Sequence, residues 1–265
     1  METIKRDLYL NRLIERRENG SIKVITGIRR CGKSYLLFKL YYQYLLGSGV
    51  EESRIIRIPL DDDDYGDLHD SRKLSSYIKE RISDDGIWYV FLDEVQMCRG
   101  FESVLNGLNR RENLDIYVTG SNSKFLSTDV LTEFRGRGDE IRVFPLCFSE
   151  YVSAYSGDKY DAWMDYCTYG GLPLILSRKT DELKSKYLID LCRELYLKDI
   201  EERHRLRGDV RGWKLILSVT VAIRDIISNQ HLRSQTAVKC SKSRNHWCFL
   251  LNPNSLELQC DILEL

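Results

Sequence analysis

No apolar run in this sequence approaches the roughly 18 residues that a membrane-spanning helix requires. A signal-peptide pattern is also missing. The chain opens instead with METIKRDLYLNRLIERR, in which charged and apolar residues follow the spacing of an amphipathic helix. These absences predict a cytoplasmic protein with no membrane partner.

Net charge is absent as well, since 40 Lys and Arg residues balance 40 Asp and Glu residues. A chain without excess positive charge is a poor candidate for broad electrostatic capture of nucleic acid or membrane surfaces. Binding of that kind would need a local basic patch. The length of 265 residues is enough for one sizeable domain and a smaller one.

The eight cysteines include no C-x-x-C pair and no Cys/His spacing that resembles a zinc site. They are therefore expected to stay reduced. Cys31 lies inside the motif described next, where a small filler is the favoured interpretation and a redox sensor the weaker one.

What the sequence does contain is a complete phosphate-loop motif. GIRRCGKS matches G-x-x-x-x-G-K-[ST] at Gly27, Gly32, Lys33 and Ser34, between an apolar strand-like run and an apolar helix-like run. A loop in that setting aims backbone N–H groups at an anion, while Lys33 reaches the β- and γ-phosphates and Ser34 holds Mg²⁺. The alternative is a glycine-rich structural turn. The residues expected to bind ATP are Gly27, Ile28, Arg29, Arg30, Cys31, Gly32, Lys33, Ser34 and Tyr35.

Strand-like and helix-like segments alternate through residues 1–147, which predicts an α/β domain with a parallel sheet and helices on both faces. Besides the run before Gly27, the strand-like segments are 54–60, 87–93, 114–121 and 140–146. Helix follows helix through 148–207, which predicts a small helical subdomain. Residues 208–265 are rich in Ser, Asn, Gln and Cys and are predicted to form an irregular tail.

Two acids end one of the strand-like segments, VFLDE at Val90 to Glu94. At a strand end Asp93 is placed to hold Mg²⁺ through water, and Glu94 to act as the base for an attacking water molecule. A solvated acidic turn is the alternative. Mg²⁺ ligands are thus expected from Ser34 and Asp93.

Two further segments carry candidate catalytic residues. In VTGSNS, Ser121 or Asn122 could hydrogen-bond the γ-phosphate or the attacking water, although an ordinary helix cap explains such residues equally well. In FRGRGDE, Arg135 and above all Arg137 could stabilise charge on a transferring phosphoryl group, within one chain or across a contact between copies. Solvated surface arginines are the alternative. A role across a contact would require a homo-oligomer.

ATP is favoured over GTP because the guanine-reading pattern N/T-K-x-D does not occur. In addition, no glycine follows Asp93 at the position that GTPases use.

VITGIRRCGKSYLL, YVFLDEVQ, YVTGSNSKFLS, FRGRGDEIRVFPLCFSEY and YGGLPLIL occur in that order. Over roughly residues 1–207 the chain thereby closely resembles a prokaryotic group of AAA-type P-loop ATPases. The resemblance implies an ASCE-type sheet, ATP and Mg²⁺. It places Asp93 at the Walker B position, Glu94 at the base, Asn122 at the sensor and Arg137 at the arginine position.

Members of that group usually continue into a C-terminal domain of unknown function related to restriction-endonuclease-like folds. The residues after Gly208 do not match that pattern, so the chain resembles a truncated or out-of-register member. The resemblance is the sole ground for DNA as a partner.

The leading hypothesis is an ATPase that converts hydrolysis into a conformational change acting on an unknown partner. A slow-turnover nucleotide-dependent switch or scaffold module is the alternative, and Glu94 favours the first because a pure switch needs no base. A small-molecule kinase would use the same loop, but the sequence reveals no acceptor pocket.

Overall fold

The computed structural model describes residues 3–120, 134, 136–192, 247–251 and 258–262. The chain divides into two compact units, Met1–His204 and Arg205–Leu265. The expected domain boundaries at residues 147 and 207 stay predictions. Within the described part, no helix has both the length and the apolar character needed to cross a membrane.

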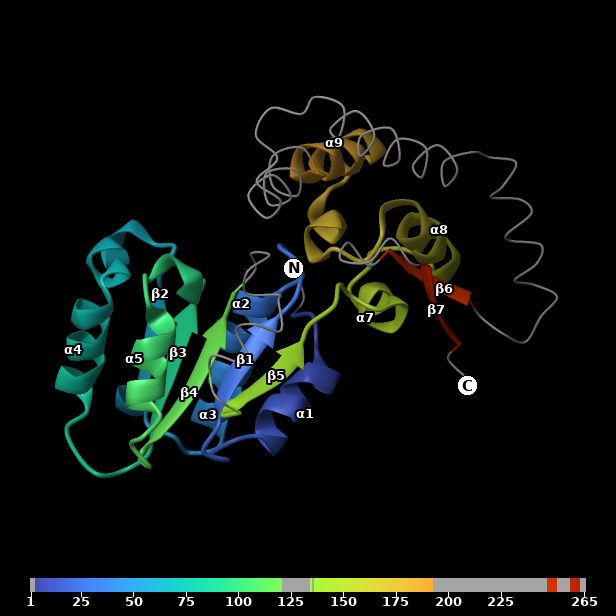
Figure 1. The fold of residues 1–265 in the computed structure, drawn as a ribbon. Helices are drawn as coiled ribbons and strands as arrows, with labels where there is room; N and C mark the ends of the chain where they lie inside the picture. Colours follow the sequence, from blue (N-terminus) through green and yellow to red (C-terminus); the bar gives the residue numbers. More distant parts are fainter. Residues whose placement is uncertain (1–2, 121–133, 135, 193–246, 252–257, 263–265) are drawn as a thin grey trace, which may run out of the picture. The chain divides into compact units, whose positions relative to one another are not determined.

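Five parallel strands form the sheet of the first unit, in the order β2-β3-β4-β1-β5 (Figure 1). The strands are β1 (Ile22–Thr26), β2 (Ile55–Pro59), β3 (Trp88–Asp93), β4 (Leu114–Thr119) and β5 (Gly138–Arg142). Parallel neighbours require crossover connections, which the helices supply. The predicted fold class, an α/β P-loop NTPase sheet flanked by helices, is confirmed.

Helices cover both faces of this sheet. One face carries α4 (Ser71–Arg81) and α5 (Phe101–Leu108). The other carries α1 (Asp7–Glu15) and a continuous helical stretch made of α2 (Lys33–Tyr35), the π-helical η1 (Leu36–Tyr41) and α3 (Tyr42–Gly47). The central strands β1, β3 and β4 are therefore buried on both faces, which explains their nearly continuous apolar sequences.

Successive residues of β4 show how the two faces are built. Ile116 and Val118 belong to the buried cluster that includes α5, whereas Tyr117 packs on Tyr41 of η1 with ring centroids 4.9 Å apart. The alternation follows from the two-residue period of a strand.

A charged pair is buried on the face of the sheet that α1 covers. Lys23 of β1 is fully buried, pairs with Asp115 of β4 and also donates to the carbonyl of Ser21 at 3.0 Å. Asp115 accepts a further hydrogen bond from the Tyr117 hydroxyl at 2.7 Å. Buried charges of this kind persist because each has a partner.

The strand β5 differs from its expected span of 140–146, since it begins at Gly138 and ends at Arg142. Val143 still donates to the carbonyl of Thr26 at 2.8 Å. Pro145 follows closely, and a proline has no N–H to extend the ladder. The sequence pattern also predicts a short helix near 127–134, which lies outside the described residues apart from its last position.

After β5 the first unit continues as helices, as expected. They are α7 (Phe148–Ser153), α8 (Lys159–Tyr169), the 3₁₀ helix η5 (Pro173–Ser177) and α9 (Asp181–Leu191). Asp165 of α8 links three of these segments, because it accepts from the Tyr151 hydroxyl at 2.5 Å and pairs with Lys184 at 2.5 Å. The expected extension of α9 to residue 207 lies outside the described residues.

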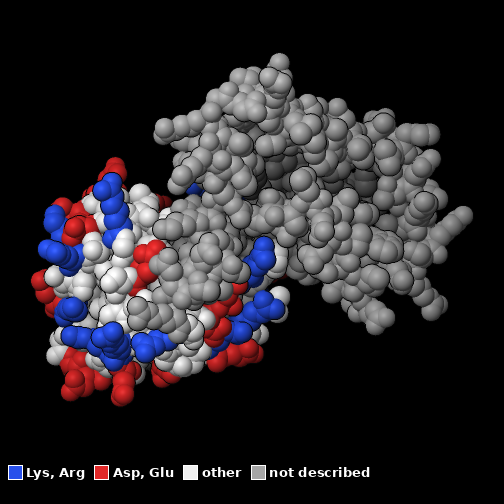
Figure 2. Space-filling view, in the orientation of Figure 1, with Lys and Arg blue, Asp and Glu red and all other residues white. Residues whose placement is uncertain are grey.

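In the second unit, β6 (Trp247–Leu251) and β7 (Leu258–Ile262) pair as an antiparallel two-stranded sheet. The sequence pattern had indicated no regular element there. On the face shown in Figure 2, acidic and basic side chains are interspersed over the coloured part of the molecule, in keeping with a formal net charge of zero.

Candidate functional site

The carboxyl ends of β1, β3 and β4 meet at one edge of the sheet. Ile25 of β1 is in register with Thr119 of β4, and Leu92 of β3 is in register with Val118. The loop after β1 and the acids that end β3 therefore flank Thr119. Ligands of open parallel sheets bind at such carboxyl edges.

The loop between β1 and α2 needs glycine at two positions. Gly27 has a φ of 144°, and a Cβ there would lie 2.2 Å from the carbonyl oxygen of Val143. Gly32 has a φ of 99° and begins the helical stretch. A residue with a Cβ would be strained at both positions and would collide with Val143 at position 27. The two glycines of the motif are therefore required by the backbone conformation of the loop.

Lys33 lies in the first helical turn with only 4% of its surface exposed. Its Nζ donates to the carbonyls of Gly27 and Ile28, both at 3.0 Å. An ammonium group has three N–H donors, so these carbonyls use two of them. The loop is thus wrapped around a buried cation, which is the charge that a polyphosphate needs.

The Asp93 carboxylate ends β3 with 6% exposure and forms hydrogen bonds with two hydroxyl groups, those of Ser34 and Thr119. Burial raises the pKa of Asp93, and these two hydrogen bonds oppose that rise. The donor set of one carboxylate and one hydroxyl at a phosphate loop fits Mg²⁺, which prefers oxygen ligands. The two expected magnesium ligands, Ser34 and Asp93, are therefore in contact. Within the described residues, no group of three or more His, Cys, Asp or Glu side chains forms a separate metal cluster.

Glu94 has a left-handed backbone conformation, with φ and ψ both 48°. Its N–H donates to the Thr119 hydroxyl oxygen at 3.2 Å, and its carboxylate accepts a hydrogen bond from the side-chain amide of Gln96. The other amide atom, Gln96 Oε1, is buried with no hydrogen-bond partner among the described residues. Glu94 is thus held at its backbone by Thr119 and at its carboxylate by Gln96.

Cys31 is fully buried, with its thiol directed at the carbonyl of Val143 at 3.4 Å. Burial raises the pKa of this thiol above its ordinary value, while the charges of Lys33 and Arg6 act in the opposite direction. A buried, protonated thiol supports the interpretation of Cys31 as a small filler rather than a redox sensor.

Two expected catalytic residues are not brought to this edge by the described structure. Asn122, together with its alternative Ser121, lies outside the described residues. Arg137 is exposed at the opposite, amino-terminal edge, where its carbonyl accepts from the N–H of Ile22 at 2.8 Å. Thr26, at the loop, is four residue steps along β1 from Ile22, about 13 Å at the usual rise.

Sequence reasoning missed Thr119 and Gln96. Thr119 sits within the VTGSNS segment, but the candidates predicted from that segment were the residues after it, Ser121 and Asn122. A polar residue at the last position of an otherwise buried strand is the signal that could have identified it. Gln96 follows the acid pair by two residues and ends the YVFLDEVQ segment, in which only Asp93 and Glu94 were predicted to have a role.

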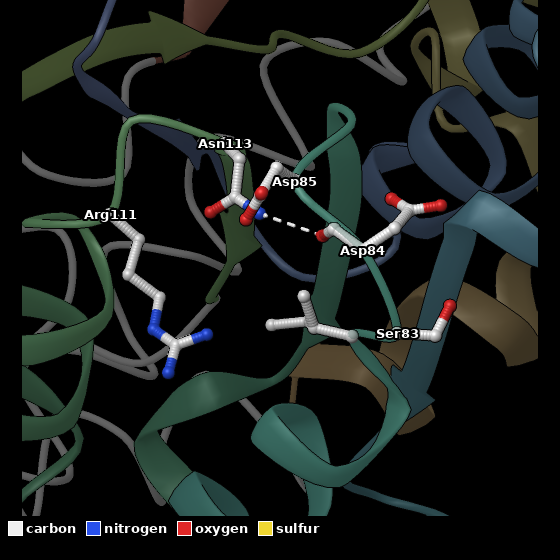
Figure 3. Close-up of a pocket in the computed structure, with 6 residues that line it drawn as sticks. Ser83, Asp84, Asp85, Arg111 and Asn113 are labelled. Atoms are coloured by element: carbon white, nitrogen blue, oxygen red, sulfur yellow. Dashed lines mark hydrogen bonds between the residues drawn. The ribbon is translucent and has the colours of Figure 1, made fainter.

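A hollow of about 440 Å³ lies elsewhere, at the amino ends of β3 and β4, as Figure 3 shows. Its lining residues are Ile82, Ser83, Asp84, Asp85, Arg111 and Asn113. Asp84 already pairs with Arg54 at 2.8 Å, and its carbonyl accepts from Asn113 at 3.3 Å. We assign this hollow to the loops that join strands and helices, because two of its polar lining residues, Asp84 and Asn113, bond to each other.

Comparison with known proteins matches residues 19–152 to the family model described as AAA domain. An uncharacterized protein of Haemophilus influenzae is 32% identical over 228 residues, covering 84% of this chain and 56% of its own length. Uncharacterized protein MJ1544 of Methanocaldococcus jannaschii is 27% identical over 238 residues, covering 83% and 51% respectively. The chain thus spans about half the length of these relatives.

Among solved structures, the Aeropyrum pernix ORC1 protein in complex with DNA aligns with a TM-score of 0.44 and 12% identity, over 76% of this chain and 69% of that one. Caenorhabditis elegans PCH-2 aligns with a TM-score of 0.40 and 18% identity, over 56% and 42%. At these scores the alignments carry no argument about function.

Proposed function

This chain belongs to the AAA domain family, and on that premise we propose that it binds ATP with Mg²⁺ and hydrolyses ATP to ADP and phosphate. The observation that supports the proposal is the Thr119 hydroxyl, which links Asp93 to Glu94 at the edge where the phosphate loop surrounds Lys33. A cation, a pair of acids and a set of loop N–H groups meet there.

Each side chain at this edge has a distinct task in the proposal. Lys33 binds the β- and γ-phosphates, and the loop N–H groups orient them. Ser34 and Asp93 hold Mg²⁺, which supplies neutralisation of phosphate charge when bound. These residues fix the γ-phosphorus in line for attack.

Glu94 acts on the water molecule. Its carboxylate accepts the proton while the water oxygen bonds to the γ-phosphorus and the bond from that phosphorus to the ADP oxygen breaks. Thr119 holds the Glu94 backbone beside Asp93, so base and metal ligand keep one spacing. Asn122 is proposed as the sensor of the γ-phosphate.

Arg137 is proposed to act on a neighbouring copy. It lies at the amino edge of β1 whereas the phosphate loop follows the carboxyl edge, so the site of another chain is the one it could complete. An arginine supplied in trans can contribute about 10³–10⁵ in rate in related chemistry. ATPase activity would then depend on a homo-oligomer.

Hydrolysis is proposed to drive a conformational change on a macromolecular partner that neither the site nor the relatives identify. DNA enters only through the family resemblance, since acidic and basic side chains are interspersed on the face in Figure 2.

A slow nucleotide-dependent switch is the second candidate, and the hydrogen bond from Gln96 to the Glu94 carboxylate favours it. A Glu94 carboxylate that keeps its hydrogen bond from Gln96 would accept a proton from water less readily. Turnover would then be rare, with bound nucleotide setting the conformation.

Steady-state phosphate release from ATP, with and without Mg²⁺, tests the proposal and separates the two candidates. Sustained Mg²⁺-dependent release that Glu94→Gln removes supports the ATPase. Asp85→Asn is the matched control because Asp85 is an exposed acid at the hollow. Tight ATP binding with no turnover above the Glu94→Gln background supports the switch, and absence of ATP binding rejects both.

A further inference from the structure

Arg6 lies just before α1, and only 3% of its surface is exposed. Its Nη1 donates to the carbonyl of Cys31 at 3.2 Å, and its Nη2 donates to the carbonyl of Phe144 at 2.6 Å. A guanidinium is buried at high cost unless it has such partners. Arg6 therefore joins the phosphate loop to the segment that follows β5.

Glu150 of α7 is a third partner of the same side chain. Arg6 Nε lies 3.1 Å from Glu150 Oε1, an ion pair in which the N–H is not aligned for a hydrogen bond. The other oxygen of Glu150 accepts from the N–H of Cys147 at 3.0 Å, which caps the first turn of α7. Arg6 is thereby connected to the start of the helical segment as well.

The carbonyl that Arg6 holds belongs to the peptide between Cys31 and Gly32. In a planar trans peptide the C=O and the N–H point in opposite directions, and the described chain has no cis peptide bond. Holding the Cys31 carbonyl therefore sets the direction of the Gly32 N–H, one of the loop donors proposed to face phosphate. Pro173 of η5 also touches this place, with Cγ 3.8 Å from where a Gly32 Cβ would be.

We propose that Arg6 is a positioning residue that couples nucleotide at the phosphate loop to α7. The inference rests on the proposed function, because it needs a nucleotide on the loop. Phosphate oxygens that attract the loop N–H groups reorient the Cys31–Gly32 peptide, and the carbonyl on which Arg6 is anchored moves with it. Arg6 transmits that change to Phe144 and Glu150. A residue that only anchored the loop would need its contact with the Cys31 carbonyl and no other.

Hydrogen–deuterium exchange of the full chain, with and without the non-hydrolysable analogue AMP-PNP and Mg²⁺, tests this coupling. In the unmodified chain we expect slower exchange in the loop, 27–35, and also in α7, 148–153. Arg6→Gln should weaken AMP-PNP binding about tenfold by calorimetry and abolish the α7 protection even at saturating AMP-PNP. A merely structural role would not remove the response of α7 while the loop stays protected.

Glu150→Gln separates the two ends of the link, because it leaves the contact between Arg6 and Cys31 intact. AMP-PNP affinity should stay within about twofold, while α7 loses its protection. This variant decides the question if Arg6→Gln fails to fold. Arg16→Gln is the control, because Arg16 also flanks α1 and the substitution breaks its 3.0 Å ion pair with Asp139. The exchange of this variant should respond to AMP-PNP as that of the unmodified protein does.

Protection of the loop without protection of α7 in the unmodified chain overturns the coupling and leaves the proposed function standing. Unchanged α7 protection in Glu150→Gln overturns it as well. Failure of AMP-PNP to bind the unmodified chain rejects the proposed function, and the coupling with it.

Discussion

The hydroxyl of Thr119, at the end of β4, donates a hydrogen bond to the carboxylate of Asp93, at the end of the neighbouring strand β3. The same oxygen accepts from the backbone N–H of Glu94 at 3.2 Å. One hydroxyl therefore joins the proposed metal ligand to the proposed base, and it fixes their spacing before any ligand arrives.

Thr119→Val removes this hydroxyl with little change in volume. We expect ATP affinity within about threefold of the unmodified chain and a turnover number at least about tenfold lower, because Glu94 loses its backbone anchor. Thr119→Ser keeps the hydroxyl and should retain most of the activity. Equal turnover of the Val and Ser variants would show that the hydroxyl has no part in catalysis.

Lys33→Ala should weaken ATP binding at least tenfold, which corresponds to about 1.4 kcal/mol. The reason is the loss of the buried cation around which the loop carbonyls gather. Lys39→Ala is the control, since Lys39 is an exposed lysine further along the same helical stretch. Isothermal titration calorimetry measures both, and an unchanged affinity for Lys33→Ala would remove the phosphate-loop interpretation.

Glu94→Gln keeps the shape of the side chain and removes its charge. ATP should stay bound, while phosphate release falls by about 10²–10⁴ as is typical when a general base is lost. Rapid-quench measurement of a single turnover separates this chemical step from product release. Retention of most of the activity would assign the base to another residue.

Arg137→Ala should abolish hydrolysis and spare ATP binding, because the residue lies at the amino edge of the sheet and is proposed to serve another copy. Specific activity of the unmodified chain should rise with protein concentration. Arg72→Ala, an exposed arginine on α4, is the control.

Mixing Arg137→Ala with Glu94→Gln decides between the arrangements. If Arg137 acts in trans, some contacts in the mixture combine an intact Glu94 with an intact Arg137, and part of the activity returns. A mixture that stays inactive, together with a specific activity that is independent of concentration, would refute the trans role.

Cys31 should resist alkylation at pH 8 in the native protein. Alkylation requires the thiolate, and burial raises the pKa of the Cys31 thiol. The exposed Cys147 and Cys167 are the internal controls. Mass spectrometry after brief iodoacetamide treatment reports each site, and labelling of Cys31 as fast as Cys147 would contradict the buried environment.

Much of the sheet domain could be read from local patterns in the sequence. Nearly continuous apolar runs predicted strands in a sheet covered on both faces, and the structure has β1, β3 and β4 buried throughout. The phosphate loop could also be predicted from the sequence, because its tight turn needs glycine at fixed positions and Gly27 has no room for a Cβ. Such signals are confined to neighbours in the chain.

Other features depended on which strands became neighbours. The place of β4 between β1 and β3 brings Thr119 to Asp93 and Lys23 to Asp115, and no periodicity encodes strand order. Parallel pairing of β1 with β5 likewise put Arg137 at the edge away from the loop.

The sequence by itself determined most strands and helices of the first unit and the path of the phosphate loop, because those depend on side chains and dihedral angles close together along the chain. Only the tertiary structure decided that Arg6 holds Cys31, Phe144 and Glu150 at once. A buried guanidinium must take its partners from whatever the packing places around it, and those partners are 25 to 144 positions away in the chain.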